Sequence, residues 1–389
     1  MLHRYLFLRL RRGNDNPRRA CHQASPGVNH DHQISMEMPD NNTQRIAYLD
    51  ILRLIATLAV IFIHVVADGL PLSFGQYNWY VAVVGGSLVR WAVPVFVMIS
   101  GALYLNPQKQ ITTETVLKRK VPRLLSAYVS WWLIYALAIV LVWYVIKKEP
   151  FQFEWLAPHY HLWFLPMLCG VYLLIPLLRP IASDSKLLRY ALVIWLCYLA
   201  GSFAFVDEIK QIAPLFAMNT IVGYAGYFLL GYYLSTLETT KGQRRVIYIL
   251  GVVSALATIG GSIGLSVSKG AFDEKFYTYL SVHVAMMSAA LFVFVKERTA
   301  GRAPKAYRLI DYVRRDLFGI YLTHDLWLMV LNKEIIRNMF NQAVTLPLIC
   351  IAVFVLSLYT TKLIRKIPFV NKILILDGGD VSCRNTFFW

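Results

Sequence analysis

The chain has 389 residues, of which 57% are hydrophobic and only 16% are charged, and its formal net charge is +17. A soluble domain carries about a quarter charged residues, so this composition predicts a membrane protein. The five cysteines form no CxxC pair and no spacing typical of metal ligands, so we expect neither a disulfide framework nor a metal site. No basic segment is interleaved with aromatic residues, which excludes a nucleic-acid partner.

The sequence divides into three parts of different composition. Residues 1–45 are polar and basic with frequent Pro, Gly and Asn, which predicts a disordered cytosolic tail. Met36 or Met38 is an alternative start, since the membrane pattern begins shortly after them. Residues 46–366 carry recurring apolar runs and form the expected membrane domain. Residues 367–389 are expected to be a C-terminal cytosolic tail.

The apolar runs predict an all-α, polytopic membrane protein with about ten transmembrane helices of about 20 residues each. Most Lys and Arg residues fall in alternate connecting segments and in the two tails. By the positive-inside rule, we expect both termini to face the cytosol and the basic surface to face anionic lipids of the bilayer. The expected spans are 46–67, 80–104, 122–146, 161–179, 187–206, 217–236, 246–268, 276–295, 317–334 and 343–364.

The first apolar run, YLDILRLIATLAVIFIHVVADG, contains Arg53 and His64. Eleven residues at 100° each make three turns plus about 20°, so both side chains share one helix face, about 16 Å apart along the axis. Asp50 is placed to pair with Arg53, and Asp68 to hold one nitrogen of His64 and fix its tautomer. Charged groups at membrane depth are costly and usually functional. The alternative to a functional role is a structural one, in which Asp50 and Arg53 form an ion pair at the membrane interface and His64 forms a hydrogen bond to another helix.

The second run contains VRWAVPVFVMISG, which places Arg90 near the middle of the bilayer. An unpaired guanidinium would be costly there. Two interpretations remain open: a packing helix in which Arg90 pairs with Asp50 or Asp325, and a positively charged cavity wall. The Ser100–Gly101 pair predicts a close approach between helices.

Two later segments carry further polar groups. In HYHLWFLP, we interpret His159 as a loop histidine and expect His161 to point into the helix bundle. In FGIYLTHDLWL, Tyr321, His324 and Asp325 are expected about 10 Å from the cytosolic end of a span. For these three residues, a structural role in hydrogen bonding and a role in lining the site are equally supported alternatives.

Taken in order, these segments resemble the acyltransferase 3 family of integral-membrane acyltransferases. The matching pieces are Arg53-x10-His64 in LDILRLIATLAVIFIH, then RWAVPVFVMISG, HLWFLPMLCGVYLLIPLL and GIYLTHDL. They keep the family's order and cover residues 45 to 366, approximately. Within the family, the chain is most similar to the enterobacterial-common-antigen O-acetyltransferase branch.

The resemblance implies transfer of an acyl group, usually acetyl, from cytosolic acyl-CoA to a hydroxyl of a surface polysaccharide or lipid-linked sugar. It implies acetyl-CoA as the donor substrate, no metal, and a multi-pass location in the bacterial inner membrane. On this basis we assign donor binding to Arg53, Tyr321 and His324. We assign catalysis to His64, Asp68, Arg90 and His161.

In the corresponding mechanism, His64 is the general base, oriented by Asp68 or by a group on a neighbouring helix. Arg90 or a Tyr or His donor stabilises the oxyanion. An acetyl-histidine intermediate on His64 is the competing route. A different function remains open, a proton-coupled transporter or glycan exporter, because buried His, Arg and Asp residues also suit such proteins.

Overall fold

The computed structural model describes residues 41–67, 70, 74–107, 109, 111–205, 213–300, 307–333, 336, 339–367, 370–371 and 374. They belong to one compact unit that runs from Asp40 to Trp389. The described residues form helices and no β-strand, which confirms the all-α prediction. Asp68, nearly all of the predicted N-terminal tail and most of the C-terminal tail lie outside the described residues.

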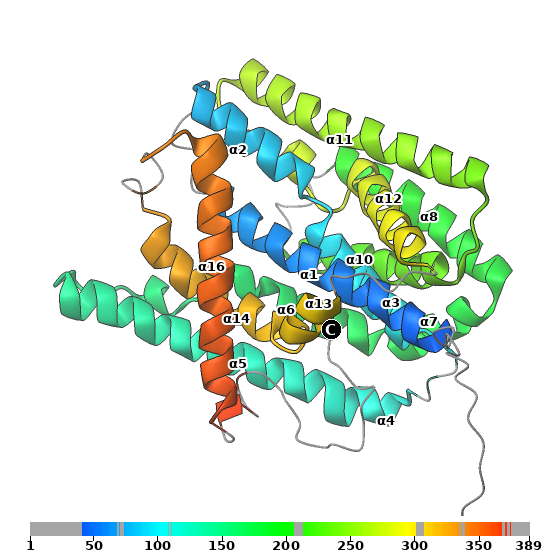
Figure 1. Ribbon diagram of the computed structural model, residues 1–389, viewed down its shortest axis with the longest axis horizontal. Coiled ribbons are helices and arrows are strands. Elements are labelled where there is room, and N and C mark those ends of the chain that lie inside the picture. The colour runs from blue at the N-terminus through cyan, green and yellow to red at the C-terminus, as the bar shows by residue number, and fades with distance from the viewer. Residues whose placement is uncertain are drawn as a thin grey trace, which may run out of the picture. The chain divides into compact units, whose positions relative to one another are not determined.

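Each of the ten expected segments coincides with a helix or with a run of consecutive helices (Figure 1). The elements are α1 (Asn41–Ala67), α2 (Tyr77–Leu88), α3 (Ala92–Tyr104), α4 (Thr113–Thr115), η1 (Val116–Lys120), α5 (Val121–Val140), η2 (Leu141–Ile146), η3 (Phe153–Leu156), η4 (Tyr160–Trp163), α6 (Phe164–Leu173), α7 (Ile175–Ser183), α8 (Ser185–Ala204), α10 (Ala213–Thr236), α11 (Lys241–Lys269), η5 (Lys275–Tyr277), α12 (Val282–Thr299), α13 (Tyr307–Val313), α14 (Leu317–Leu331) and α16 (Gln342–Arg365).

The number of candidate spans differs from the predicted ten. Among the described residues, seven helices are long and apolar enough to cross a membrane. The pair of α6 and α7, bent by 58°, makes an eighth if it counts as one span, and Pro176 at the start of α7 accounts for the break. Two expected segments, those of α10 and α14, fall outside this set, and α14 is a shorter apolar helix of 15 residues. The protein is therefore a multi-pass membrane protein, and its described part contains seven or eight candidate spans.

Helix α1 lies at the centre of the described helices (Figure 1). It packs against α2, α3, α12, α14 and α16. Helix α11 lies at one edge against α2 and α12, whereas α5 lies at the opposite edge against α6. A polar group on α1 is therefore surrounded by side chains from several other helices.

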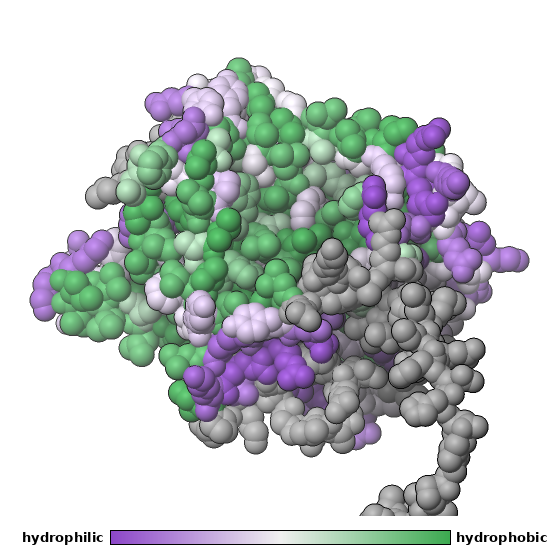
Figure 2. Space-filling view, viewed as in Figure 1, coloured by the Kyte–Doolittle hydropathy of each residue, from purple (hydrophilic) through white to green (hydrophobic). Residues whose placement is uncertain are grey.

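The peripheral helices expose apolar side chains. Leu133 and Leu137 on α5, Val252 and Leu256 on α11, and Leu348 on α16 are each more than half exposed. Figure 2 shows hydrophobic residues over much of the drawn face. An apolar surface of this extent is unfavourable in water and suits contact with lipid chains.

Helices α3 and α10 approach each other closely through glycines. A Cβ at Gly101 would lie 1.8 Å from the carbonyl oxygen of Phe228, and one at Gly231 would lie 2.0 Å from that of Met98. Backbone atoms cannot move aside as a flexible side chain can. The close approach predicted at Gly101 is thus confirmed, and it sets the distance between two helices that line the site.

Replacing Gly101 with Ala tests this contact. The new methyl group would force α3 and α10 apart, so we expect a stability loss of about 1–3 kcal/mol. Thermal unfolding of the detergent-purified protein, monitored by size-exclusion chromatography, measures the melting temperature of each variant. Gly264→Ala on α11 is the control, since a Cβ there meets nothing within 4 Å. Equal melting temperatures for the two variants would contradict the packing argument.

Candidate active site

Helix α1 places Arg53 and His64 three turns apart on one face, as their spacing predicts. Arg53 is buried and forms an ion pair with Asp50, which confirms the predicted pairing. The Thr57 hydroxyl donates to the carbonyl of Arg53 at 2.8 Å. The Arg53 Nε is buried and has no hydrogen-bond partner among the described residues, so this guanidinium retains a donor for a ligand.

Further basic groups gather near Arg53. The Nζ of Lys120 lies 5.3 Å from the centroid of the Tyr104 ring. Arg179 donates to the carbonyls of Tyr104 and Lys109, both at 2.9 Å. Burial, and to a smaller degree the positive charge of Arg53, lowers the pKa of Lys109. This end of α1 is therefore electropositive and suits an anionic ligand.

At the other end of α1, His64 meets two histidines from distant parts of the chain. The ring centroids of His64 and His324 are 5.3 Å apart, those of His161 and His324 are 5.1 Å apart, and those of His64 and His161 are 6.4 Å apart. His161 and His324 are almost completely buried, so His161 points into the bundle as expected. We call these three residues the histidine cluster.

The structure places Tyr321 and His324 beside His161. Their expected position, about 10 Å from the cytosolic end of a span, stays a prediction. That prediction assumed that the helix begins at the membrane surface. In fact α14 begins after Asp316, which is buried and paired with Arg365 at 2.7 Å, so the helix starts within the protein.

A chain of hydrogen bonds fixes the tautomer of His161. The Nε2 of His159 lies 3.2 Å from Oδ2 of Asp325, and an ionised carboxylate only accepts, so this nitrogen donates. Burial lowers the pKa of His159 to about 4, so its ring is neutral near pH 7 and its Nδ1 accepts. The Nδ1 of His161, 3.0 Å away, must then donate to it. His161 keeps a lone pair on Nε2, which is buried and unpartnered among the described residues.

This network corrects our interpretation of His159 as a loop histidine. The residue does precede η4, but its ring stacks on Tyr135 with centroids 4.6 Å apart and bonds to Asp325 and His161. The sequence contains the signal, since His159 and His161 sit two residues apart. Their link to α14 is a tertiary contact that spacing cannot reveal.

The tautomer of His324 is fixed in the same way. Its Nδ1 lies 2.6 Å from the carbonyl of Tyr321, which can only accept, so the proton is on Nδ1 and Nε2 keeps a lone pair. That Nε2 is also buried without a partner among the residues described. Tyr160, which our sequence reasoning missed, packs on His64 with centroids 5.1 Å apart and donates to Asp325 at 2.6 Å. The cluster thus presents two basic nitrogens beside His64.

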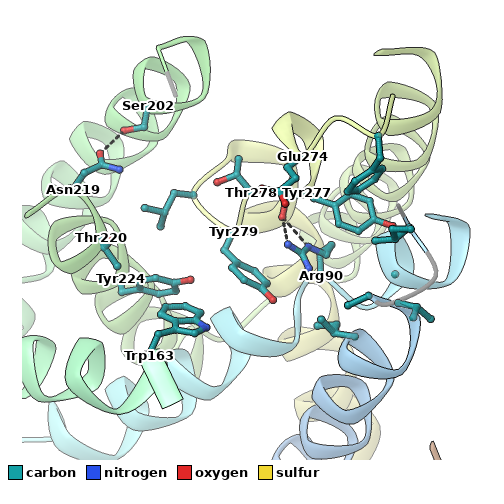
Figure 3. Close-up of a pocket in the computed structure, with 17 residues that line it drawn as sticks. Arg90, Trp163, Ser202, Asn219, Thr220, Tyr224, Glu274, Tyr277, Thr278 and Tyr279 are labelled. Carbon is teal, nitrogen blue, oxygen red and sulfur yellow. Dashed lines mark hydrogen bonds between the residues drawn. The ribbon is translucent and has the colours of Figure 1, made fainter. Parts of the chain in front are cut away.

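Two adjacent cavities reach this cluster. The smaller, about 20 Å³, is lined by His64, His161 and Val60 and has room for about one water. The larger, about 690 Å³, has the size of a small-molecule site and is drawn in Figure 3. Ile63, Trp163 and Tyr279 line both cavities, so the larger one ends beside the histidine cluster.

Arg90 lines the larger cavity. Its Nε donates to the Tyr277 carbonyl at 2.7 Å, and its guanidinium carbon lies 4.2 Å from the centroid of the Tyr279 ring (Figure 3). Of the two interpretations, the cavity wall is the one observed, and the acceptor of Arg90 is this carbonyl rather than Asp50 or Asp325.

One group of side chains has the composition of a metal site. Among the described residues, the potential ligand atoms of His159, His161 and Asp325 lie within 4.8 Å of one another. Nitrogen and oxygen donors of this kind can bind a divalent cation. In the structure they bond to each other, and Tyr160 also donates to the carboxylate, while Nε2 of His161 has no partner among the described residues.

Comparison with known proteins places the chain in a family. The model of the family described as Acyltransferase domain (Acyl_transf_3) matches residues 46–362, most of the chain, including the histidine cluster and Arg53. Comparisons with curated proteins and with solved structures found no match. The family match favours acyl transfer over transport, while the enterobacterial-common-antigen branch stays a prediction. The chain therefore belongs to the acyltransferase 3 family, and it is a multi-pass membrane acyltransferase.

Proposed function

We propose that the protein is an O-acetyltransferase of the bacterial inner membrane, which moves an acetyl group from cytosolic acetyl-CoA to a hydroxyl of a surface polysaccharide or lipid-linked sugar. The histidine cluster beside the larger cavity carries this proposal. Acylation of a hydroxyl needs a base within reach of the attacking oxygen and a site with little competing water. The small buried cavity has His64 in its lining and room for little water, and it lies next to a cavity of substrate size.

The electropositive end of α1 supports CoA as the donor. Guanidinium groups suit phosphates, and Arg53 lies beside Lys109, Lys120 and Arg179. Between Arg53 and His64, the same helix face carries Thr57 and Val60, and Val60 already lines the small cavity. In our proposal the pantetheine arm follows this face, so the thioester reaches the histidine cluster.

His64 takes the proton of the acceptor hydroxyl as its oxygen attacks the thioester carbonyl. The carbon–oxygen bond forms, the carbon–sulfur bond breaks, and the proton passes to the leaving CoA thiolate. The second nitrogen of His64 donates to a lone pair on His161 or His324, which is the orienting group on a neighbouring helix that we named as the alternative to Asp68. Arg90 or the imidazolium stabilises the oxyanion. Because Tyr321 and His324 lie beside His161, they contact the thioester end of the donor in this arrangement.

Replacing His64 with Ala tests the base. Loss of a general base lowers the rate about 10²–10⁴-fold, so transfer of acetyl from acetyl-CoA to surface glycans should be nearly abolished. Mass spectrometry of the glycans measures the product, and membrane yield verifies insertion. The control is His283→Ala on α12, whose ring contacts Phe203 and Phe276 outside the cluster. Near-native transfer by the His64 variant would reject the assignment. An acetyl group trapped on His64 by rapid quenching would favour the covalent route.

Replacing Asp325 with Asn tests the tautomer network. The amide NH2 can donate to His159 Nε2, which reverses the hydrogen bonds and places the proton of His161 on Nε2. With the basic nitrogen lost, we expect the kcat of acetyl-CoA turnover to fall about tenfold or more, with the affinity for acetyl-CoA unchanged. A variant with native kcat would show that these tautomers do not matter.

Replacing Arg53 tests the donor end. Arg53→Ala removes the charge-assisted contact to phosphate and should weaken acetyl-CoA binding about tenfold or more, measured by equilibrium binding in detergent. Arg53→Lys keeps the charge opposite Asp50 and should bind with intermediate affinity. If both variants bind acetyl-CoA like the native protein, the donor phosphates lie elsewhere.

A further inference from the structure

The larger cavity is built from segments far apart in the sequence. Asn219 and Thr220 on α10 lie on one side, Arg90 and Tyr277 lie on the other, and Trp163 is at its lower edge in the view of Figure 3. The lining combines aromatic and polar side chains.

The wall next to the histidine cluster is aromatic. The rings of Trp163 and Tyr279 are nearly parallel, with an angle of 26° and centroids 6.2 Å apart, and Tyr224 lies 5.9 Å from Trp163. The Tyr227 hydroxyl donates to the carbonyl of Tyr279 at 2.6 Å, and Arg90 lies over the Tyr279 ring. Because Trp163 and Tyr279 also line the small cavity, a ligand held against them is next to the catalytic groups.

Uncharged polar groups also line the cavity. The Oδ1 of Asn219 accepts hydrogen bonds from Ser202, at 3.0 Å, and from Tyr198, so its NH2 group remains to donate to a ligand. Thr220 adds a hydroxyl beside Tyr224, and Thr278 adds one beside Tyr279 (Figure 3). Among the described residues, the charged side chains of the lining are Arg90 and Glu274, one of each sign, so these side chains together favour neither an anion nor a cation.

Flat aromatic faces together with amide and hydroxyl groups in one cavity match a sugar ring, whose CH face packs on aromatic carbon while its hydroxyls form hydrogen bonds. We propose that this cavity is the acceptor site, in which an uncharged sugar ring stacks on Trp163 and Tyr279 and directs one hydroxyl toward His64. The inference rests on the proposed function and makes Trp163 an acceptor-positioning residue. A lipid-linked sugar and a residue of finished polysaccharide share this chemistry.

The test compares Trp163→Ala with Trp163→Phe, which keeps a stacking face, in cells that lack the native protein. Loss of the aromatic contact should lower glycan acetylation about tenfold, whereas Phe should retain most of it. The affinity of each purified variant for acetyl-CoA should stay within about twofold of native. Trp143→Ala is the matched control, because Trp143 lies in η2 and lines neither cavity. Thr278→Trp fills part of the cavity with a bulky side chain and should also stop glycan acetylation.

Mass spectrometry of the lipid-linked saccharides and of the extracted polysaccharide then locates the acetyl ester. An ester in either fraction that disappears in the Trp163→Ala and Thr278→Trp variants supports the proposal and identifies the source of the sugar. Native acetylation by both variants would overturn the acceptor site while leaving the transferase intact. An ester found only on protein or on a lipid without sugar would overturn it as well. A native protein that neither acetylates glycans nor releases CoA from acetyl-CoA would refute the proposed function itself.

Discussion

The structure depends on how α1 carries polar groups through a medium that cannot solvate them. A charged or hydrogen-bonding side chain in hydrocarbon costs several kcal/mol unless protein groups satisfy it. Arg53 meets this requirement with Asp50 on its own helix, while His64 contacts rings from η4 and α14. The central position of α1, in contact with several other helices, meets this need for partners.

The two ends of α1 differ in the chemistry that surrounds them. Near Arg53, basic side chains contact backbone carbonyls and the Tyr104 ring, which makes this region positive. Near His64, histidines in fixed tautomers leave basic nitrogens in a buried space. In the function that we propose, the first end binds the phosphates of the donor and the second accepts a proton, and one rigid helix sets the distance between them. Rigidity matters because small errors in placement cost rate.

The helices around α1 hold the reacting groups through contacts that leave little room for adjustment. Gly101 and Gly231 bring the backbones of α3 and α10 together, and α10 contributes Asn219 and Tyr224 to the larger cavity. Arg90 is held by the Tyr277 carbonyl, which ties the loop before α12 to the end of α2. The cavity therefore depends on the packing of the whole membrane domain.

The sequence by itself determined the helical membrane class, the shared face of Arg53 and His64, the Asp50 ion pair and the glycine contact of α3. Each of these depends on local periodicity or on a single residue type, which are readable from spacing. Only the tertiary structure decided that His324 lies beside His64 and His161, which group accepts the hydrogen bond of Arg90, and which residues join His159, Tyr160 and Asp325 in one network. These features join segments more than 150 residues apart, and local spacing does not encode contacts over such a separation.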